Sequence, residues 1–147
     1  MASDMISEVA DNEFYSLAYH RFLADGKLMG SRCPSCGATH VPPKPICGRC
    51  GSCEMRLIEA GTKGKIAAYT VITVGSPLMV EEGYDREHPY ATGVIELEGD
   101  GRVSARILGV DVMHPENIKI GTPVTAEFVQ AEHGGEKKTF LAFRAQD

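Results

Sequence analysis

The sequence has few features of proteins that bind nucleic acids or cross membranes. It contains no basic run longer than Lys137-Lys138, and its 147 residues carry a net charge of −5. Because binding to phosphates needs clustered Lys and Arg, this balance argues against a nucleic-acid-binding surface. The amino terminus lacks the basic start and the apolar stretch of a signal peptide, and no segment approaches membrane-spanning length. We expect a cytoplasmic protein with neither nucleic acid nor membrane as a partner.

The sequence also lacks common signatures of catalytic sites. It has no Gly-x-Ser-x-Gly elbow, no His-Glu-x-x-His pair and no glycine-rich dinucleotide fingerprint. Its five histidines are scattered, and two of them precede prolines in expected loops, a context more typical of turns than of general bases. Since no motif places a nucleophile beside a base, we expect no catalytic residues and no activity from the chain alone.

The five cysteines all lie between positions 33 and 53. Four of them form two Cys-x-x-Cys pairs that are separated by ten residues and are each followed by glycine: Cys33, Cys36, Cys47 and Cys50. Four thiolates at this spacing suit the tetrahedral shell of zinc, and a glycine eases the positive φ of each turn. A closed shell leaves no position for water, so the ion is expected to be structural, with rubredoxin-like iron as the alternative.

Cys53 offers a rival pair with Cys50, but Glu54 follows it where the other pairs have glycine. We therefore expect Cys53 to be unligated and half-buried or buried rather than reactive. His40 is expected to reach the metal only if it displaces a cysteine.

The rest of the pattern predicts a mainly β protein after an N-terminal helix. Apolar residues recur at helical spacing from Phe14 to Leu28, and Asp25-Gly26 provides a stop, so we expect an amphipathic helix that packs on its own chain or, alternatively, in a partner's groove. After Gly61 the pattern changes to strands. The five expected strands are Lys65–Val74, Tyr90–Glu98, Arg102–Val110, Pro123–Glu132 and Thr139–Arg144.

Five strands with a helical turn at Asn117–Gly121 between the third and the fourth favour a Greek-key OB-fold barrel over a generic five-stranded sheet. The expected divisions are a tail and helix at 1–29, a zinc ribbon at 30–60 and the barrel at 61–147. The longest connection, Gly75–Pro89, is acidic and is interpreted as either a solvated face or a mobile partner-contact loop. Its acidic residues are Glu81, Glu82, Asp85 and Glu87.

Aromatic residues leave a second function open, that of a single-stranded nucleic-acid-binding OB-fold protein with a zinc ribbon. Such proteins stack bases on exposed rings. The acidic balance favours a core role instead for the five candidate rings, Tyr69, Tyr90, Phe128, Phe140 and Phe143.

The chain resembles one known family over about Phe14 to Arg144. The resemblance rests on features in a fixed order: the helix, the first Cys-x-x-Cys-Gly turn or knuckle, Val41-Pro-Pro-Lys44, the second knuckle and the barrel opening Gly61-Thr-Lys-Gly-Lys-Ile66. The family is the thiolase-associated acyl-CoA proteins, or domain of unknown function thirty-five. The resemblance implies a rubredoxin-like zinc ribbon followed by an OB-fold, with the zinc ligands at the four paired cysteines. It implies a small non-catalytic subunit that joins thiolases, and in some cases hydratases or aldolases, in acyl-CoA metabolism.

The expected partner is thus a thiolase-fold subunit in a hetero-oligomer, bound through the ribbon, the helix and the Gly75–Pro89 loop. Coenzyme A or acyl-CoA at that interface would need cations for its phosphates. The candidates are Lys44, Lys63, Lys65, Arg102 and Arg106.

Overall fold

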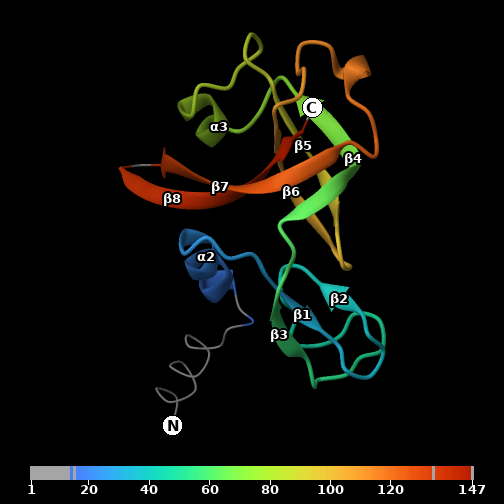
Figure 1. Ribbon diagram of the computed structural model, residues 1–147. Coiled ribbons are helices and arrows are strands. Elements are labelled where there is room, and N and C mark those ends of the chain that lie inside the picture. The colour runs from blue at the N-terminus through green and yellow to red at the C-terminus, as the bar shows by residue number, and fades with distance from the viewer. Residues whose placement is uncertain (1–13, 15, 134, 147) are drawn as a thin grey trace.

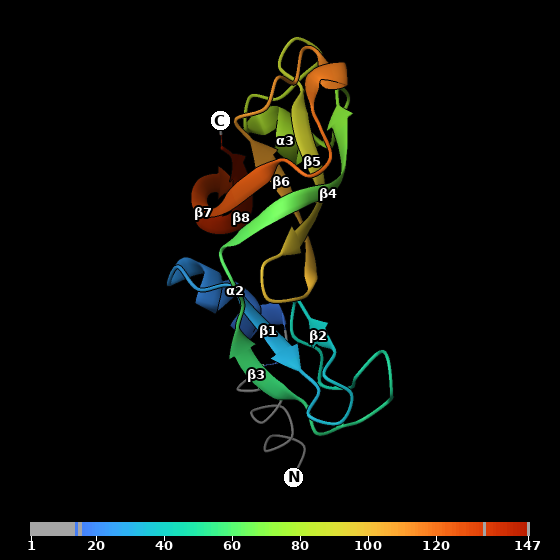
Figure 2. The same cartoon turned by 45° about the vertical axis from the view of Figure 1, so that its right-hand side comes forward.

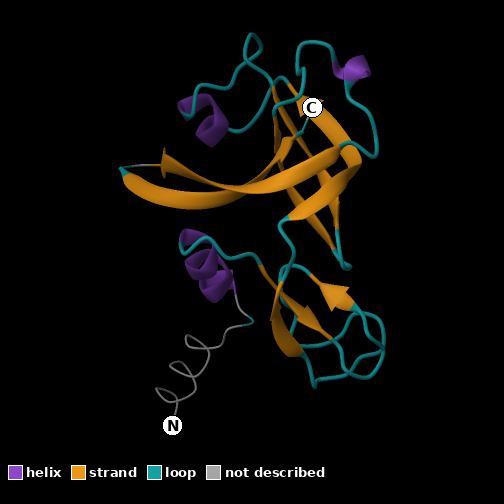
Figure 3. Cartoon of the chain, viewed as in Figure 1, coloured by secondary structure: helices purple, strands orange, loops and turns teal. Residues whose placement is uncertain are grey.

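The computed structural model describes residue 14, residues 16–133 and residues 135–146. A closed β-barrel forms one end of the molecule, and a small three-stranded sheet forms the other (Figures 1 and 2). Strands dominate and helices are short (Figure 3). The predicted mainly β architecture with an N-terminal helix is therefore confirmed.

Helix α2 (Ser16–Ala24) lies between the two ends of the molecule (Figure 1). It ends where Asp25-Gly26 was expected to stop it, and Gly26 adopts the left-handed φ of +76°. Ala18, Tyr19 and Leu23 are buried, and the helix packs on the last barrel strand. The apolar stripe therefore packs on its own chain, as expected, but Leu17 on the same helix remains 68% exposed. The expected tail at residues 1–13 lies outside the described residues.

The small sheet is built from β1 (Met29–Arg32), β2 (Thr39–His40) and β3 (Arg56–Glu59) in the antiparallel order β2-β1-β3. The four paired cysteines lie in the two connections of this sheet: Cys33 and Cys36 between β1 and β2, and Cys47 and Cys50 between β2 and β3.

The barrel closes in the order β4-β5-β6-β8-β7, with β8 parallel to β6 and every other pair antiparallel. That order, in which the fifth strand inserts between the third and the fourth, is the OB-fold order. A 3₁₀ turn, η1 (Pro115–Asn117), lies between the third and fourth strands, slightly earlier than predicted because Pro115 begins it. The barrel strands are β4 (Lys63–Ile72), β5 (Tyr90–Leu97), β6 (Arg102–Leu108), β7 (Pro123–His133) and β8 (Glu136–Ala145).

One hydrophobic core joins the barrel to the elements outside it. Ile66, Ile95 and Phe143 fill the barrel interior and have at most 1% exposure. Leu23 of α2 and Val41 of the ribbon belong to the same buried cluster. Burial of each such side chain contributes roughly 1.5–3 kcal/mol, so helix, ribbon and barrel stabilise one another.

The connection from Gly75 to Pro89 contains a short helix that the sequence pattern did not predict, α3 (Pro77–Glu81). Helices α2 and α3 lie on opposite sides of the β7–β8 hairpin (Figures 1 and 2). An ion pair between Oε2 of Glu82 and Nη1 of Arg106 on β6, at 2.9 Å, holds this segment against the barrel. Glu82 was expected in a solvated or mobile loop, but the ion pair buries it.

The aromatic residues divide between the core and the outer face. Phe143 is fully buried, and Tyr69 and Phe128 pack against the core, as expected. The core interpretation is wrong for Tyr90 and Phe140, whose rings surround the guanidinium of Arg106. They point outward because the pleat alternates their positions with buried Ala91 and Leu141.

Candidate metal centre

Four thiols meet at the tips of the two ribbon knuckles. The Sγ atoms of Cys33, Cys36, Cys47 and Cys50 all lie within 4.8 Å of one another. Sγ of Cys33 is 3.5 Å from that of Cys50, and Sγ of Cys36 is 3.6 Å from that of Cys47. A zinc tetrahedron with Zn–S bonds of about 2.3 Å has S–S edges of about 3.8 Å. The four cysteines are therefore positioned to bind one metal ion.

The two knuckles have the same backbone geometry. The amide of Gly37 donates to the carbonyl of Cys33 at 2.8 Å, and the amide of Gly51 donates to that of Cys47 at 2.9 Å. Both glycines have a left-handed φ, +78° and +79°, as their place after the second cysteine predicted. The Arg49 amide also donates to Sγ of Cys47, at 3.4 Å. Backbone N–H groups of this kind stabilise thiolate ligands.

The electrostatics of the cluster favour a bound cation. Hydrogen bonding to His40 and to backbone amides lowers the pKa of Cys47 to about 5. A backbone hydrogen bond at Ser52 favours the Cys50 thiolate, but its neighbour Cys33, burial and the other thiols raise its pKa to about 12. Four adjacent thiols cannot all lose their protons without a compensating charge, and a divalent metal supplies that charge.

Cys53 is exposed and lies outside the four-thiol cluster. It was expected to be at least half-buried, and that expectation is wrong. Cys53 lies in the connection from Cys50 to β3.

His40 lies beside the four thiols, although it was expected to approach the metal only by displacing a cysteine. Its Nε2 lies 3.6 Å from Sγ of Cys47, outside the set of clustered thiols. This pair brings a thiol and a base together, but Cys47 is buried and crowded by three other sulfurs, which favours a metal ligand over a nucleophile. His40 ends β2, and Cys47 lies seven positions later in the connection from β2 to β3.

Two other histidines are turn residues, as expected. Nδ1 of His88 lies 3.0 Å from Asp85, and Nδ1 of His114 lies 3.0 Å from Asp111. Each histidine follows its aspartate by three residues, and both pairs are largely exposed. Hydrogen bonding to His88 lowers the pKa of Asp85.

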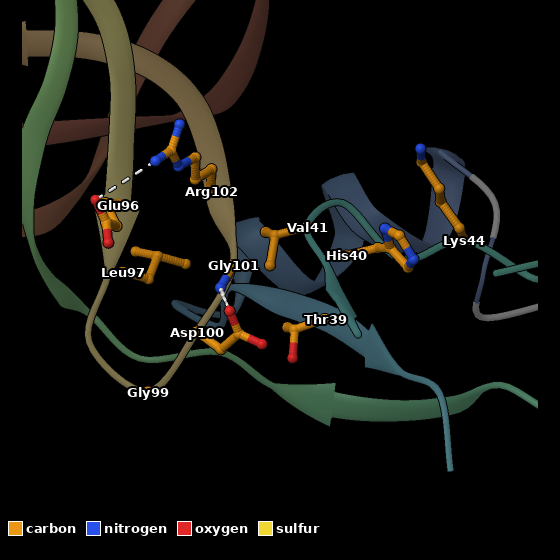
Figure 4. Close-up of a pocket in the computed structure, with 10 residues that line it drawn as sticks. All are labelled: Thr39, His40, Val41, Lys44, Glu96, Leu97, Gly99, Asp100, Gly101 and Arg102. Carbon is orange, nitrogen blue, oxygen red and sulfur yellow. Dashed lines mark hydrogen bonds and ion pairs between the residues drawn. The ribbon is translucent and has the colours of Figure 1, made fainter. Parts of the chain in front are cut away.

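A groove of about 750 Å³ runs between the ribbon and the β5–β6 turn (Figure 4). The ribbon side supplies His40 and Lys44, and the barrel side supplies Arg102, which pairs with Glu96 at 3.7 Å. The ribbon and the turn approach closely, because a Cβ added at Gly101 would lie only 3.2 Å from the Thr39 side chain.

The groove brings together two of the five cations predicted to serve coenzyme A, Lys44 and Arg102. Lys65 lines a different groove of about 390 Å³ on the barrel, and Lys63 is exposed on the same strand. Arg106 is engaged by Glu82 and by three aromatic rings. The structure therefore separates the five candidates into three places.

No helix within the described residues is both long and apolar enough to cross a bilayer.

Comparison with known sequences finds a matching domain model for the ribbon and another for the barrel. The domain described as "ChsH2, rubredoxin-like zinc ribbon domain" matches residues 21–56, and "ChsH2, C-terminal OB-fold domain" matches residues 57–129. A "DUF35 domain-containing scaffold protein" of Methanocaldococcus jannaschii is 31% identical over 110 residues, which cover 74% of this chain and 72% of the relative. A "probable enoyl-CoA hydratase alpha subunit" of Thermomonospora curvata is 28% identical over 72% of this chain, which spans only 30% of that relative's length.

Solved structures give the same assignment. The structure titled "Ltp2-ChsH2(DUF35) aldolase" has a TM-score of 0.67 and 26% identity, over 86% of this chain and 91% of that one. A DUF35-family protein of unknown function from Sulfolobus solfataricus shares the fold, with a TM-score of 0.56 and 19% identity over 97% of each chain. Both domain models match this chain, and a DUF35 scaffold protein is 31% identical to it, so the chain belongs to the DUF35 family.

Proposed function

We propose that this chain is a non-catalytic zinc-ribbon and OB-fold subunit that binds and supports an enzyme acting on acyl-CoA thioesters. The partner we propose is a thiolase-fold subunit. Fold alone does not define a function, so the proposal rests on the surfaces and on the chemistry of this chain.

The names of the relatives support an accessory role. One is named a scaffold protein, one a subunit of a probable enoyl-CoA hydratase, and one is part of an aldolase complex. An accessory role in acyl-CoA metabolism agrees with all three names. The choice of a thiolase-fold partner comes from the sequence resemblance and is the finer part of the proposal.

The observation that carries the proposal is the apolar outer side of the α3 segment. Leu78 and Val80 are 53% and 55% exposed, although the buried Glu82–Arg106 pair fixes the same segment to the barrel. Apolar side chains held outward on a fixed support suit a surface that a partner covers.

The metal in this proposal is structural. We propose that Cys33, Cys36, Cys47 and Cys50 hold one zinc ion, which cross-links the two knuckles and leaves no coordination position for substrate. The proposed divisions are residues 1–29, 30–60 and 61–147. A cytoplasmic location belongs to the same proposal, because a reducing compartment keeps these thiols available to the metal.

Coenzyme A or acyl-CoA is proposed to bind at the partner interface. Lys44 and Arg102 suit its phosphates better than Arg106, because they line one open groove. Arg102 pairs with Glu96 through exposed side chains, whereas the ion pair of Arg106 with Glu82 is largely buried. The nucleic-acid alternative has less support, because Tyr90 and Phe140 surround Arg106 and Phe143 is buried, so these rings do not offer a stacking surface.

Co-expression tests the proposal. The tagged chain is expressed in turn with a thiolase, an enoyl-CoA hydratase and an aldolase subunit encoded in the same source organism, and complexes are isolated by size exclusion. We expect a stable hetero-oligomer with the thiolase whose thiolysis activity exceeds that of the thiolase alone. A complex with only the hydratase or the aldolase would preserve the accessory role and overturn the thiolase assignment. No complex with any of them would overturn both.

A further inference from the structure

The imidazole of His40 lies between the candidate metal centre and the groove of Figure 4. Its Nε2 is 3.6 Å from Sγ of Cys47, and the same ring lines the groove beside Lys44. Four thiolates around a divalent ion leave a net negative charge on the centre. A metal-bound thiolate accepts hydrogen bonds and has no proton to donate, so a ring N–H that faces this sulfur acts as the donor.

The backbone around His40 is fixed on both sides. His40 pairs with Ser31 across β1 and β2. The buried Ser31 hydroxyl accepts a hydrogen bond from the Lys44 amide at 2.9 Å and donates one to the Lys44 carbonyl at 3.1 Å. One buried residue therefore anchors the chain at both ends of the segment that carries the ring.

The ring also has a defined place above the second knuckle. A Cβ added at Gly48 would lie 3.6 Å from Cε1 of His40 and 3.7 Å from Nζ of Lys44. A neutral donor and a cation thus converge over the backbone that follows Cys47. This arrangement places positive potential beside a centre of negative charge.

We propose that His40 is a positioning residue of the metal centre, whose Nε2–H donates a hydrogen bond to the Cys47 thiolate and offsets part of its charge. The inference rests on the proposed zinc site. Groups that hydrogen-bond to metal ligands orient them and tune the metal, and their loss typically weakens metal binding about 10- to 100-fold. His40 is half-buried and N–H···S bonds are long, so we expect the lower end, about tenfold.

The test uses the full chain loaded with Co²⁺, whose sulfur-to-metal charge-transfer band reports the electron density on the thiolates. His40→Phe keeps a ring of similar size and removes the donor. His40→Gln places an amide N–H near the position of Nε2, whereas His40→Asn places it near Nδ1. The three variants therefore separate hydrogen bonding from packing and identify the nitrogen that donates. The band and the Co²⁺ and Zn²⁺ affinities, measured against a competing chelator at fixed pH, are the two readouts.

We expect every variant to bind one metal per chain. His40→Phe and His40→Asn should shift the band to lower energy and weaken metal binding about tenfold, and His40→Gln should restore both. His114→Phe, which changes an exposed histidine that bonds Asp111, is the matched control and should behave as the wild type.

A wild-type band and affinity in His40→Phe would overturn the inference. So would equal losses in the Phe and Gln variants, because that result would mean that the imidazole acts through packing alone. Failure of the zinc site itself would differ from both, since the wild-type chain would then bind no metal.

Discussion

Arg106 and Glu82 form an ion pair at 2.9 Å on the outer face of the barrel, although only 14% and 8% of their side chains are exposed. Phe140 lies under the guanidinium, whose carbon is 4.0 Å from the ring centroid, and Nη2 also contacts Sδ of Met79. The pair joins β6 to the end of α3. A segment that looked like a solvated acidic loop is thereby held in a defined place.

Removing the cation should release that segment. In Arg106→Met the carboxylate of Glu82 loses its charged partner while it remains largely buried, which costs about 3–5 kcal/mol of unfolding free energy. Urea unfolding measures this loss. Limited trypsin digestion should also show faster cleavage after the exposed Arg86 within the segment, detected by mass spectrometry.

Arg102→Met is the matched control, because Arg102 and Glu96 pair at 3.7 Å with exposed side chains. That change should cost no more than about 1 kcal/mol. The double variant Arg106→Met with Glu82→Met should recover much of the lost stability, since apolar side chains can replace a buried pair. Equal losses in the two single variants would contradict the structural role of the buried pair.

Metal binding should depend on the paired cysteines and not on the fifth. Because folding of a small ribbon is coupled to its metal, Cys47→Ser should lose zinc and unfold the ribbon while the barrel remains folded. Cys53→Ser should keep one zinc per chain. Elemental analysis and amide hydrogen exchange measure the two effects, and iron in the native protein would count against the zinc assignment.

The Ser31 hydroxyl should stabilise the ribbon, because it makes two hydrogen bonds to the backbone of Lys44. Ser31→Ala removes a fully buried hydroxyl and leaves the amide and the carbonyl of Lys44 without their side-chain partner, which costs about 1–3 kcal/mol. Thermal unfolding of the zinc-loaded chain measures the effect. Ser35→Ala, at an exposed position of the first knuckle, is the control and should change stability by no more than about 0.5 kcal/mol.

The parts of this structure that could be predicted are those whose residues recur at a regular period or at a fixed spacing in the sequence. The alternation of β-branched residues located the barrel strands, and the spacing of Cys33, Cys36, Cys47 and Cys50 located the thiol cluster. Contacts between distant segments left no such signal. Glu82 and Arg106 are 24 positions apart, and α3 has only five residues, which is too short to show a helical period.

His40 was expected only as a replacement for a cysteine ligand, not as a neighbour of one. Its approach to Cys47 within the connection that follows β2 is a contact that neither propensity nor motif spacing specifies. The outward direction of Tyr90 and Phe140 was likewise hidden, because aromatic residues suit both faces of a strand. What the sequence could not predict is therefore the pairing of side chains across elements, together with short elements such as α3 and β2.

The isolated chain should catalyse neither thiolysis nor condensation of acyl-CoA esters. Its one thiol beside a histidine, within the described residues, belongs to Cys47 and is buried in the proposed metal shell. Cys53 is exposed and lies outside the proposed metal shell, so it is the thiol that remains for a substrate. Activity of the purified chain that disappears in Cys53→Ala would show that the non-catalytic assignment is wrong.

Assembly with the partner should depend on exposed apolar side chains at two places. Leu17 projects from α2, and Leu78 and Val80 project from α3. Leu17→Glu and Leu78→Glu should leave zinc content and folding unchanged, because both positions are exposed. Each should weaken the complex about 10- to 100-fold, since burial of a leucine contributes roughly 1.5–3 kcal/mol.

Ile120→Glu is the control for this experiment. Ile120 is 61% exposed but lies in the connection between η1 and β7, which belongs neither to α2 nor to the Gly75–Pro89 connection. Binding to the co-expressed subunit is measured by titration at one salt concentration, because an added carboxylate also changes the net charge. If Ile120→Glu weakens the complex as much as Leu17→Glu and Leu78→Glu do, the effect is one of charge, and the partner binds elsewhere on the chain.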